Sequence, residues 1–551
     1  MTQPSNTRMQ VMWNRLLAVV EEQGQALVRA AFSPIVRECG DISAGIFDAQ
    51  GRMLAQAVTG TPGHINTMAA AVKTLSGQFS LDEMVPGDIY MTNDPWIASG
   101  HLNDFLLMMP VFFEGNLIGF TACTSHLIDL GGLGMGPEGS DIYDEGLFIP
   151  PCKLVESGNI NTLLMDIIKA NSREPMANEG DIYALIACCE AGARRLSDMM
   201  REFGIHTLER LANYIVETSR RGTLQAISDL PQGTWHNSLI VDGYDRPLEL
   251  CAALTIAEDH ILVDFDGSAA CVDKGINVPL NYAAAYTVFA LRCLIGPEIP
   301  NNAGSLAPFR VMAPKGTILN AQPPAPVAMR HTLGQMTPDL VYGCLSQALP
   351  DAVPAEGASC MYDLPLRHVP EESDWAGRAF ALELVFNGGT GARPSRDGLS
   401  ATAFPSGVWG SQIETTEAVA PILFHRRELR RDSGGAGTQR GGLGQNIEIS
   451  ARDDQDILLF LSVERVLNPA RGRHGGQPGA AGHIKIGENG ASMPGKGTFR
   501  IKAGERLYFD TPGGGGFGPP GARNPVALNK DISAGLVSPD AAKDVYGQGK
   551  Q

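Results

Sequence analysis

Glycine is concentrated in the last third of the chain, where short runs of it interrupt strand-like sequence. The densest runs are Arg440-Gly441-Gly442-Leu443-Gly444 and Thr511-Pro512-Gly513-Gly514-Gly515-Gly516, in a chain of 551 residues with 64 glycines. Neither run is followed by the Lys-Ser/Thr pair of a phosphate-binding loop. Glycine instead permits left-handed turns and close approach of one backbone to another. From about residue 377 to 518 we therefore expect strands, turns and closely packed backbone.

The first two thirds alternate between helical and strand periodicity, which predicts a mixed α/β, multidomain protein. We expect an N-terminal α/β domain over residues 1–230, a middle α/β domain over 231–380, and a C-terminal β-rich, glycine-dense domain over 381–551 with a terminal helix. Gly204 is expected to end a helix, and Glu114-Gly115-Asn116 to form a tight turn. Expected helices are 8–32, 67–75, 158–170, 181–203, 206–225, 281–295, 337–349 and 531–546, and expected strands are 89–92, 105–112, 117–122 and several over 233–266.

The charge and cysteine content narrow the class of protein. The formal net charge is -17, which argues against nucleic acid or an anionic membrane as the main partner. No run of eighteen apolar residues occurs, and residues 1–10 lack the layout of a signal sequence. The ten cysteines include no Cys-x-x-Cys spacing, so reduced thiols in a soluble cytoplasmic protein are expected.

Two similar tetrapeptides flank the expected hairpin of residues 105–122. His101-Leu-Asn-Asp104 precedes the first strand, and His126-Leu-Ile-Asp129 follows the second. If the two strands are antiparallel neighbours, these ends meet, and two imidazoles with carboxylates suit a divalent transition metal. Asp41, in Glu38-Cys39-Gly40-Asp41, comes directly before an apolar segment and could add another carboxylate. The alternative is a structural one, because a His-x-x-Asp pair also occurs as a hydrogen-bonded turn or helix cap.

Beyond these local features, motifs along almost the whole chain resemble the hydantoinase B/oxoprolinase family. The motifs are Arg37-Glu38-Cys39-Gly40-Asp41-Ile42-Ser43, Gly63-His64-Ile65, Thr92-Asn93-Asp94-Pro95, Gly100-His101-Leu102-Asn103-Asp104, His126-Leu127-Ile128-Asp129-Leu130-Gly131-Gly132, Glu145-Gly146-Leu147-Phe148-Ile149-Pro150-Pro151, Asn171-Ser172-Arg173-Glu174-Pro175, Asn302-Ala303-Gly304, Pro323-Pro324-Ala325-Pro326-Val327-Ala328, Asp432-Ser433-Gly434-Gly435-Ala436-Gly437 and the run from Thr511 to Gly516.

The resemblance implies one divalent transition metal, zinc or manganese, held by His101, Asp104 and His126, with Asp41 as a further ligand. It also implies a hetero-oligomer with a hydantoinase A-type ATPase subunit, which carries ATP and Mg²⁺ and phosphorylates the oxygen of a small cyclic amide. One position differs: family members usually carry a second histidine directly after the first one of this motif, and here that position is Leu127.

The same resemblance implies a chemistry in which the phosphorylated amide carbon is attacked by a water whose pKa the metal lowers. Asp129 would either orient His126 or act as a base, and His64, with Arg37 as a further candidate, would bind the phosphorylated intermediate. Three functions fit: a subunit of an ATP-dependent hydrolase that opens hydantoin, 5-oxoproline or lactam rings; a subunit of a ketone carboxylase; or a non-catalytic scaffold for a partner ATPase. Dependence on bicarbonate separates the first two.

Overall fold

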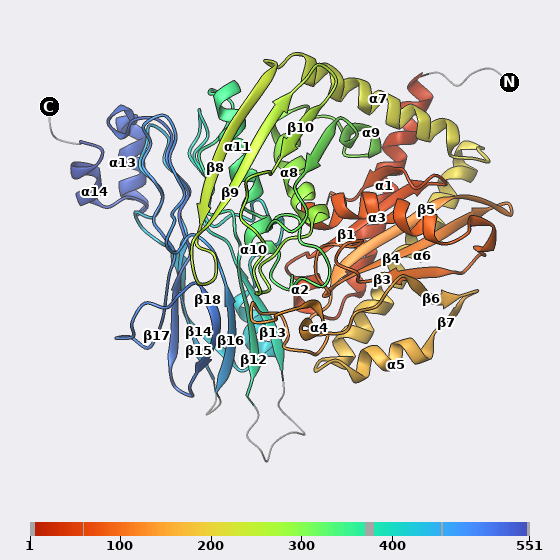
Figure 1. Cartoon of the computed structure of the whole chain (residues 1–551), viewed down its shortest axis with the longest axis horizontal. Coiled ribbons are helices and arrows are strands. Elements are labelled where there is room, and N and C mark those ends of the chain that lie inside the picture. The colour runs from red at the N-terminus through yellow and green to blue at the C-terminus, as the bar shows by residue number, and fades with distance from the viewer. Residues whose placement is uncertain (1–5, 59, 370–379, 453–455, 548–551) are drawn as a thin grey trace.

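The computed structural model describes residues 6–58, 60–369, 380–452 and 456–547 of the chain. In Figure 1 the two termini lie at opposite ends of the molecule, with the N-terminal half on the right and the glycine-rich C-terminal part on the left. The middle of the sequence lies between them. The mixed α/β class predicted from the sequence is confirmed.

A seven-stranded antiparallel sheet organises the N-terminal part. At its centre β4 and β5 form the predicted hairpin, and the turn between them uses left-handed backbone at Glu114 (φ 51°) and Gly115 (φ 83°). Because the sheet is antiparallel throughout, the ends of β4 and β5 that flank the two histidine motifs lie side by side. The strand order is β2-β1-β5-β4-β3-β6-β7, with β1 Ile42–Asp48, β2 Met53–Gln56, β3 Ile89–Thr92, β4 Asp104–Phe113, β5 Asn116–His126, β6 Cys152–Glu156 and β7 Asn159–Ile160.

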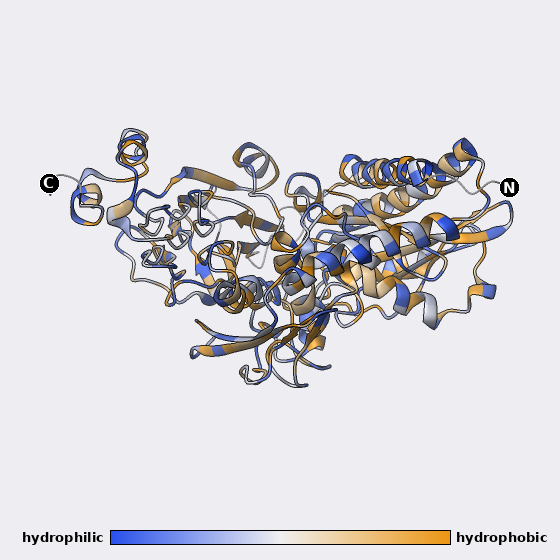
Figure 2. Ribbon diagram, turned by 90° about the horizontal axis from the view of Figure 1, so that it is seen from above, coloured by the Kyte–Doolittle hydropathy of each residue, from blue (hydrophilic) through white to orange (hydrophobic). Residues whose placement is uncertain are grey.

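Helices cover both faces of this sheet. Side chains of β4 alternate between two cores: Phe105 and Leu107 pack against the face covered by α1 and α6, and Leu106 and Met108 against the face covered by α3. Along these helices hydrophobic and hydrophilic residues alternate (Figure 2), as expected where one face of a helix is buried. The helices of this part are α1 Asn6–Ala30, α2 Pro34–Arg37, α3 Pro62–Gln78, α4 Ile142–Glu145, α5 Thr162–Ala170, α6 Pro175–Phe203 and α7 Glu209–Ser228, with a 3₁₀ turn at Leu81–Glu83.

The predicted helices differ from the structure in their boundaries: α3 and α6, for example, begin at Pro62 and Pro175, before the expected starts at 67 and 181. The helix expected over 158–170 begins only at Thr162, because Ser157 and Gly158 have positive φ and turn the chain into the β6–β7 hairpin. The Asn161 side chain then caps α5 by accepting from the backbone N–H of Leu164. The helix expected over 531–546 is two helices, α13 Pro525–Ser533 and α14 Pro539–Asp544, separated at Gly535 (φ 71°). Gly204 ends α6 in the left-handed conformation, as predicted.

The middle of the chain forms a four-stranded sheet with α8 and α11 packed against it. One hydrophobic core joins the sheet to these two helices. The sheet order is β11-β10-β9-β8, with β8 Gly233–Val241, β9 Leu248–Ile256, β10 Ile261–Asp264 and β11 Phe309–Met312, and the helices are α8 Leu280–Leu294, α9 Ala303–Leu306, α10 His331–Gly334 and α11 Thr337–Ala348.

Two further four-stranded sheets share a single core and form a sandwich. Their orders are β13-β12-β16-β18 and β14-β15-β19-β17. Strand β12 already belongs to this sandwich although it precedes residue 380, so the domain division at 230 and 380 stays a prediction. The strands are β12 Tyr362–His368, β13 Ala381–Phe386, β14 Ile422–Leu429, β15 Gln445–Ala451, β16 Ile457–Ser462, β17 His483–Ile486, β18 Lys496–Ile501 and β19 Arg506–Asp510; helix α12 spans Ile413–Val419, and Pro520–Ala522 is a 3₁₀ turn.

The densest glycine runs pack backbone against backbone. Gly514 donates its N–H to the carbonyl of Gly442 (3.0 Å), and Gly442 donates to the carbonyl of Thr390 (2.9 Å). A Cβ on Gly514 would lie 2.0 Å from the oxygen of Thr390, and a Cβ on Gly442 would lie 2.0 Å from the oxygen of Leu399. Neither glycine has positive φ. Close backbone packing, one of the two expected explanations, therefore accounts for these positions.

Within the described ranges, no helix is long and apolar enough to cross a membrane. All ten cysteines are free thiols.

Candidate metal centre

The hairpin brings three metal-binding side chains together at one end of the sheet. Asp104 is the first residue of β4 and is the cross-strand partner of His126, the last residue of β5. His101 lies one turn before β4. Its Nε2 atom is 2.7 Å from Asp104 Oδ1, and His126 Nδ1 is 3.1 Å from the same oxygen. All three residues are buried, and their ligand atoms lie within 4.8 Å of one another.

The remaining nitrogen of each histidine is held by an acceptor. His101 Nδ1 lies 2.9 Å from the carbonyl oxygen of Ala328, and His126 Nε2 lies 3.0 Å from Glu383 Oε1. His101 Nε2 and His126 Nδ1 both face Asp104 Oδ1. In the tautomer that donates an N–H to each outer oxygen, the lone pairs of these two nitrogens point to the same place. This is the arrangement in which neutral histidines bind a metal while their outer nitrogens are oriented by neighbouring oxygens.

The second oxygen of Asp104 is anchored by cations. Arg330 donates to Oδ2 at 2.6 Å and His64 Nε2 lies 2.9 Å from it. Burial would raise the pKa of Asp104, but the neighbouring histidines and Arg330 outweigh burial and hold it well below its ordinary range. Asp104 is therefore ionised, and its Oδ1 points at the two histidines.

His64 and Asp41, both predicted as site residues, lie next to this cluster. Thr61 caps α3 and accepts from the backbone N–H of His64, which fixes the start of the helix. Burial opposes protonation of His64, but the carboxylates of Asp104 and Asp41 outweigh it and raise its pKa. Asp41 Oδ1 lies 3.5 Å from His64 Nε2, and the three-residue ligand cluster does not include Asp41. A ligand role for Asp41 stays a prediction.

The donor set fits a divalent transition metal. Two imidazole nitrogens and one carboxylate oxygen are ligands that both zinc and manganese accept, and three protein ligands leave coordination positions open for water or substrate. The oriented outer nitrogens of His101 and His126 support this assignment, since a purely structural His-x-x-Asp turn does not require both rings to be fixed on one oxygen.

A buried carboxyl group supports the loop that orients His101. Glu145 Oε1 accepts from the backbone N–H groups of Val327 (2.6 Å) and Ala328 (2.8 Å), and Ala328 in turn accepts from His101. Burial raises the pKa of Glu145 to about 8. Glu145 therefore positions the segment that fixes the His101 ring.

Two other predicted residues make contacts away from the cluster. The Asp129 carboxylate accepts from Arg173, both from its side chain (2.6 Å) and from its backbone N–H (2.5 Å). Glu383, and not Asp129, contacts His126. The contacts therefore do not support an orienting role for Asp129. Arg37 is half-exposed and pairs with Glu38. A catalytic or intermediate-binding role for Asp129 or Arg37 stays a prediction.

Several site residues come from the second half of the chain and were missed in the sequence. Arg330 and Glu383 complete the contacts of Asp104 and His126. The proline-rich motif ending at Ala328 lies two residues before Arg330 and was the one signal that pointed to this region. Nearby, His331 Nε2 lies 3.9 Å from Asp363 Oδ2, and both side chains are buried with atoms that lack hydrogen-bond partners. Burial raises the pKa of Asp363 and lowers that of His331, so burial favours the neutral form of each group.

The fold and the cluster define an α/β protein with a buried His-Asp-His cluster whose donor atoms could hold a metal ion. Residues 5–520 match the family described as hydantoinase B/oxoprolinase. The chain belongs to the hydantoinase B/oxoprolinase family, and the resemblance seen in its motifs is confirmed.

Similar proteins occur in archaea, bacteria and eukaryotes. The chain is 31% identical to an uncharacterized protein of Methanocaldococcus jannaschii, over 96% of this chain and 93% of the relative. It is 29% identical to the caprolactamase subunit beta of Pseudomonas jessenii, over 96% and 93%. The crystal structure of the ATP-dependent caprolactamase from Pseudomonas jessenii superposes with a TM-score of 0.90 at 26% identity, over 100% of this chain and 98% of that chain.

A nucleotide-free structure of acetone carboxylase shares the fold, with a TM-score of 0.85 at 22% identity, over 98% of this chain and 80% of that chain. This likeness concerns the fold alone.

Proposed function

We propose that this chain is the metal-dependent subunit of an ATP-dependent hydrolase that opens a small cyclic amide: a hydantoin, 5-oxoproline or a lactam. The observation that carries the proposal is the His101, Asp104 and His126 cluster with both outer histidine nitrogens fixed. The family membership and the similarity to caprolactamase subunit beta give the class of substrate.

A cyclic amide is a poor electrophile, because resonance stabilises the carbonyl group. Phosphorylation of its oxygen by a partner subunit converts the carbonyl carbon into an activated centre. His101, Asp104 and His126 would hold a divalent metal, which would supply Lewis acidity and lower the pKa of water. The chain's own residues orient that centre: Glu383 and Ala328 hold the two rings, and Arg330 holds Asp104.

His64 supplies positive charge beside the cluster. Its raised pKa keeps the imidazole protonated more readily than an ordinary histidine, and a protonated imidazole can donate to a phosphoryl oxygen. We assign His64 to binding the phosphorylated intermediate, with Asp41 as its carboxylate partner.

The ATPase activity belongs to a partner in this proposal. The chain lacks a phosphate-binding loop motif, and a hydantoinase A-type subunit would bind ATP and Mg²⁺ and transfer the phosphoryl group. The two chains together would form the active hetero-oligomer. The name of the caprolactamase chain, subunit beta, supports such an assembly.

A ketone carboxylase subunit is the second candidate, because acetone carboxylase has the same fold. The test is a substrate screen of this chain in complex with its co-purified partner, in the presence of ATP, with and without bicarbonate. Ring opening that needs ATP and ignores bicarbonate is the expected result. Carboxylation of a ketone that requires bicarbonate would select the second candidate. A complex that does neither, and that stays intact and equally abundant when His101 and His126 are both replaced by alanine, would support a scaffold role.

A further inference from the structure

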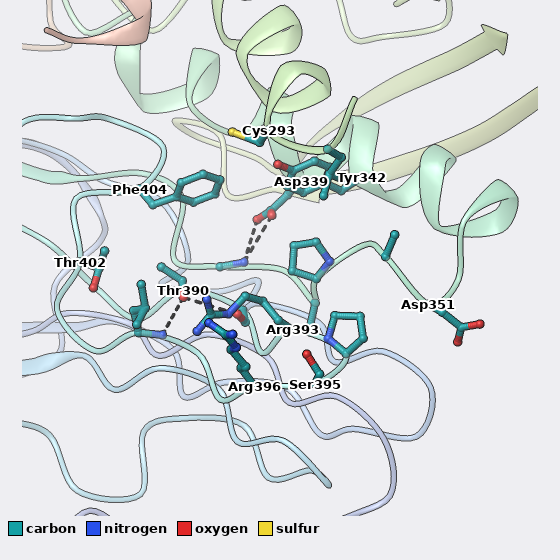
Figure 3. Close-up of a pocket in the computed structure, with 18 of the residues that line it drawn as sticks. Cys293, Asp339, Tyr342, Asp351, Thr390, Arg393, Ser395, Arg396, Thr402 and Phe404 are labelled. Carbon is teal, nitrogen blue, oxygen red and sulfur yellow. Dashed lines mark hydrogen bonds between the residues drawn. The ribbon is translucent and has the colours of Figure 1, made fainter. Parts of the chain in front are cut away.

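A cavity of about 660 Å³ lies between the middle part of the chain and the glycine-rich segments, and the metal centre does not use it. Its lining includes the end of α8, the side of α11 and the segment from residue 390 to 404 (Figure 3). None of the ligands of the metal cluster, nor the residues that orient them, lines this cavity. We call it the arginine pocket, defined by Leu294, Tyr342, Arg393, Arg396 and Phe404. Its volume falls within the range of about 300–1,000 Å³ that is typical of small-molecule sites.

One side of the arginine pocket carries most of its apolar lining, although the Asp339 carboxylate also lies on this side (Figure 3). Phe404 and Tyr342 lie on this side in Figure 3, and Leu294 and Pro354 also line the cavity. The Phe404 ring packs against Phe289, with ring centroids 5.9 Å apart. The Tyr342 hydroxyl donates to the carbonyl of Ala290, so its polar end is satisfied and its ring is left as an apolar surface.

The opposite side presents two guanidinium groups. Arg393 and Arg396 are backbone partners across a two-residue turn, with Arg393 N–H donating to Arg396 O at 2.9 Å and Arg396 N–H to Arg393 O at 3.3 Å. Directly opposed residues of such a turn project to the same side, where like charges repel each other. The turn therefore holds two positive charges together at the pocket.

Within the described parts of the chain neither arginine has a carboxylate partner. Arg393 Nη2 donates to the carbonyl of Asp397, while its Nε is buried without a hydrogen-bond partner. The Asp397 carboxylate is already taken by Arg523, at 2.8 Å. No ion pair is formed by Arg396, whose side chain is exposed.

The acidic residues of the lining do not neutralise the two arginines. Asp339 is buried and accepts from Arg465 at 2.7 Å and from Ser359 at 2.5 Å. Asp351 is exposed and lies apart from the arginines in Figure 3. Two unpaired guanidiniums in a chain with a net charge of -17 mark a local site for negative charge.

We propose that the arginine pocket binds a small organic anion: a carboxylate or phosphate headgroup joined to an apolar body. The headgroup would accept from the planar guanidiniums of Arg393 and Arg396, a geometry suited to oxyanions. The body would pack against Phe404, Tyr342 and Leu294. The site is separate from the metal centre and independent of the proposed hydrolase activity.

Isothermal titration calorimetry of the full chain tests this with four probes: hexanoate, hexyl phosphate, hexanol and inorganic phosphate. Hexanoate or hexyl phosphate, or both, should bind, and the tighter of the two identifies the preferred headgroup. Hexanol, which lacks the charge, should bind at least about tenfold more weakly, because charge-assisted hydrogen bonds are about twice as strong as neutral ones. Inorganic phosphate should also bind more weakly than hexyl phosphate, since it lacks the apolar body.

Arg393→Gln and Arg396→Gln should each weaken binding of the anionic probes by about tenfold. The matched control is Arg310→Gln, which removes an exposed arginine of β11 away from the pocket lining and should leave binding unchanged. Arg396 is exposed, so its replacement tests the site even if the Arg393 variant unfolds. Absence of binding by both anionic probes would overturn the proposal. Equal binding of hexanol and hexanoate would also do so, as would inorganic phosphate binding as tightly as hexyl phosphate or an equal loss in the Arg310→Gln control.

Discussion

Replacement of Glu383 tests whether the metal centre depends on a residue from the second half of the chain. Glu383 Oε1 lies 3.0 Å from His126 Nε2, and His126 Nδ1 faces Asp104. In Glu383→Ala the ring loses the acceptor that fixes its rotation and its tautomer. The lone pair on Nδ1 is then no longer held toward the metal.

The size of the effect follows from the role of this contact. Loss of an oxygen that orients a metal-binding histidine commonly costs about 10–100-fold in metal affinity or activity. We expect Glu383→Ala to fall in this range. Glu383→Gln keeps an oxygen that can accept from His126 but removes the charge, so its loss should lie at the lower end, about tenfold.

The matched control is Asp129→Asn. Asp129 follows His126 by three residues but binds Arg173, so this variant should keep the wild-type metal affinity. Affinity is measured on the full chain by competition with a chromophoric chelator, for zinc and for manganese, and thermal unfolding of the metal-free proteins checks that each variant is folded. The reasoning is refuted if Asp129→Asn loses as much affinity as Glu383→Ala, or if Glu383→Ala binds metal as tightly as the wild type.

Three further predictions concern coupling, pH and packing. Asp104→Asn removes negative charge from the metal ligands, so in the complex with its partner product formation should fall at least about tenfold, with a smaller fall in ATP turnover; strictly proportional losses would contradict separate sites. Burial raises the pKa of Glu145 to about 8, so the folded chain holds a proton that the unfolded chain releases near its ordinary pKa, and stability should be full at low pH and fall as pH rises toward about 8. The slope attributable to this group is at most about 1.4 kcal/mol per pH unit, and it should be absent in Glu145→Gln when urea unfolding is compared at about pH 5 and about pH 8. Gly514→Ala places a Cβ 2.0 Å from a backbone oxygen and should lower the free energy of unfolding by at least about 1–3 kcal/mol, whereas Gly521→Ala, where nothing lies within 4 Å, should leave it nearly unchanged in the same unfolding experiment.

The sequence predicted the parts of the molecule that depend on local pattern. The β4–β5 hairpin follows from two apolar runs around Glu114-Gly115-Asn116, and a hairpin necessarily places its two flanking ends together. For this reason the convergence of His101, Asp104 and His126 could be predicted before the structure was known. The end of a helix at Gly204 could likewise be predicted, because it depends only on the residues beside Gly204.

Contacts over long sequence separations could not be predicted in the same way. Arg330 is 226 residues from Asp104 and Glu383 is 257 residues from His126, and no periodicity links such positions. Asp129 was the nearer candidate for orienting His126, but Arg173 occupies its carboxylate. The glycine runs indicated close packing but not which backbone segment packs against them, because the absence of a side chain is the same whichever segment approaches.

The dependence of the centre on distant residues has a consequence for the order in which it can form during synthesis. Both histidines and Asp104 leave the ribosome before Ala328, Arg330 and Glu383 have been made. A nascent chain that ends before residue 383 holds all three ligands but lacks the oxygen that fixes His126. In the proposed metal site, full metal affinity would therefore appear only after most of the chain has been synthesised and folded. Metal binding by a nascent chain would then depend on folding of the sandwich as well as of the hairpin.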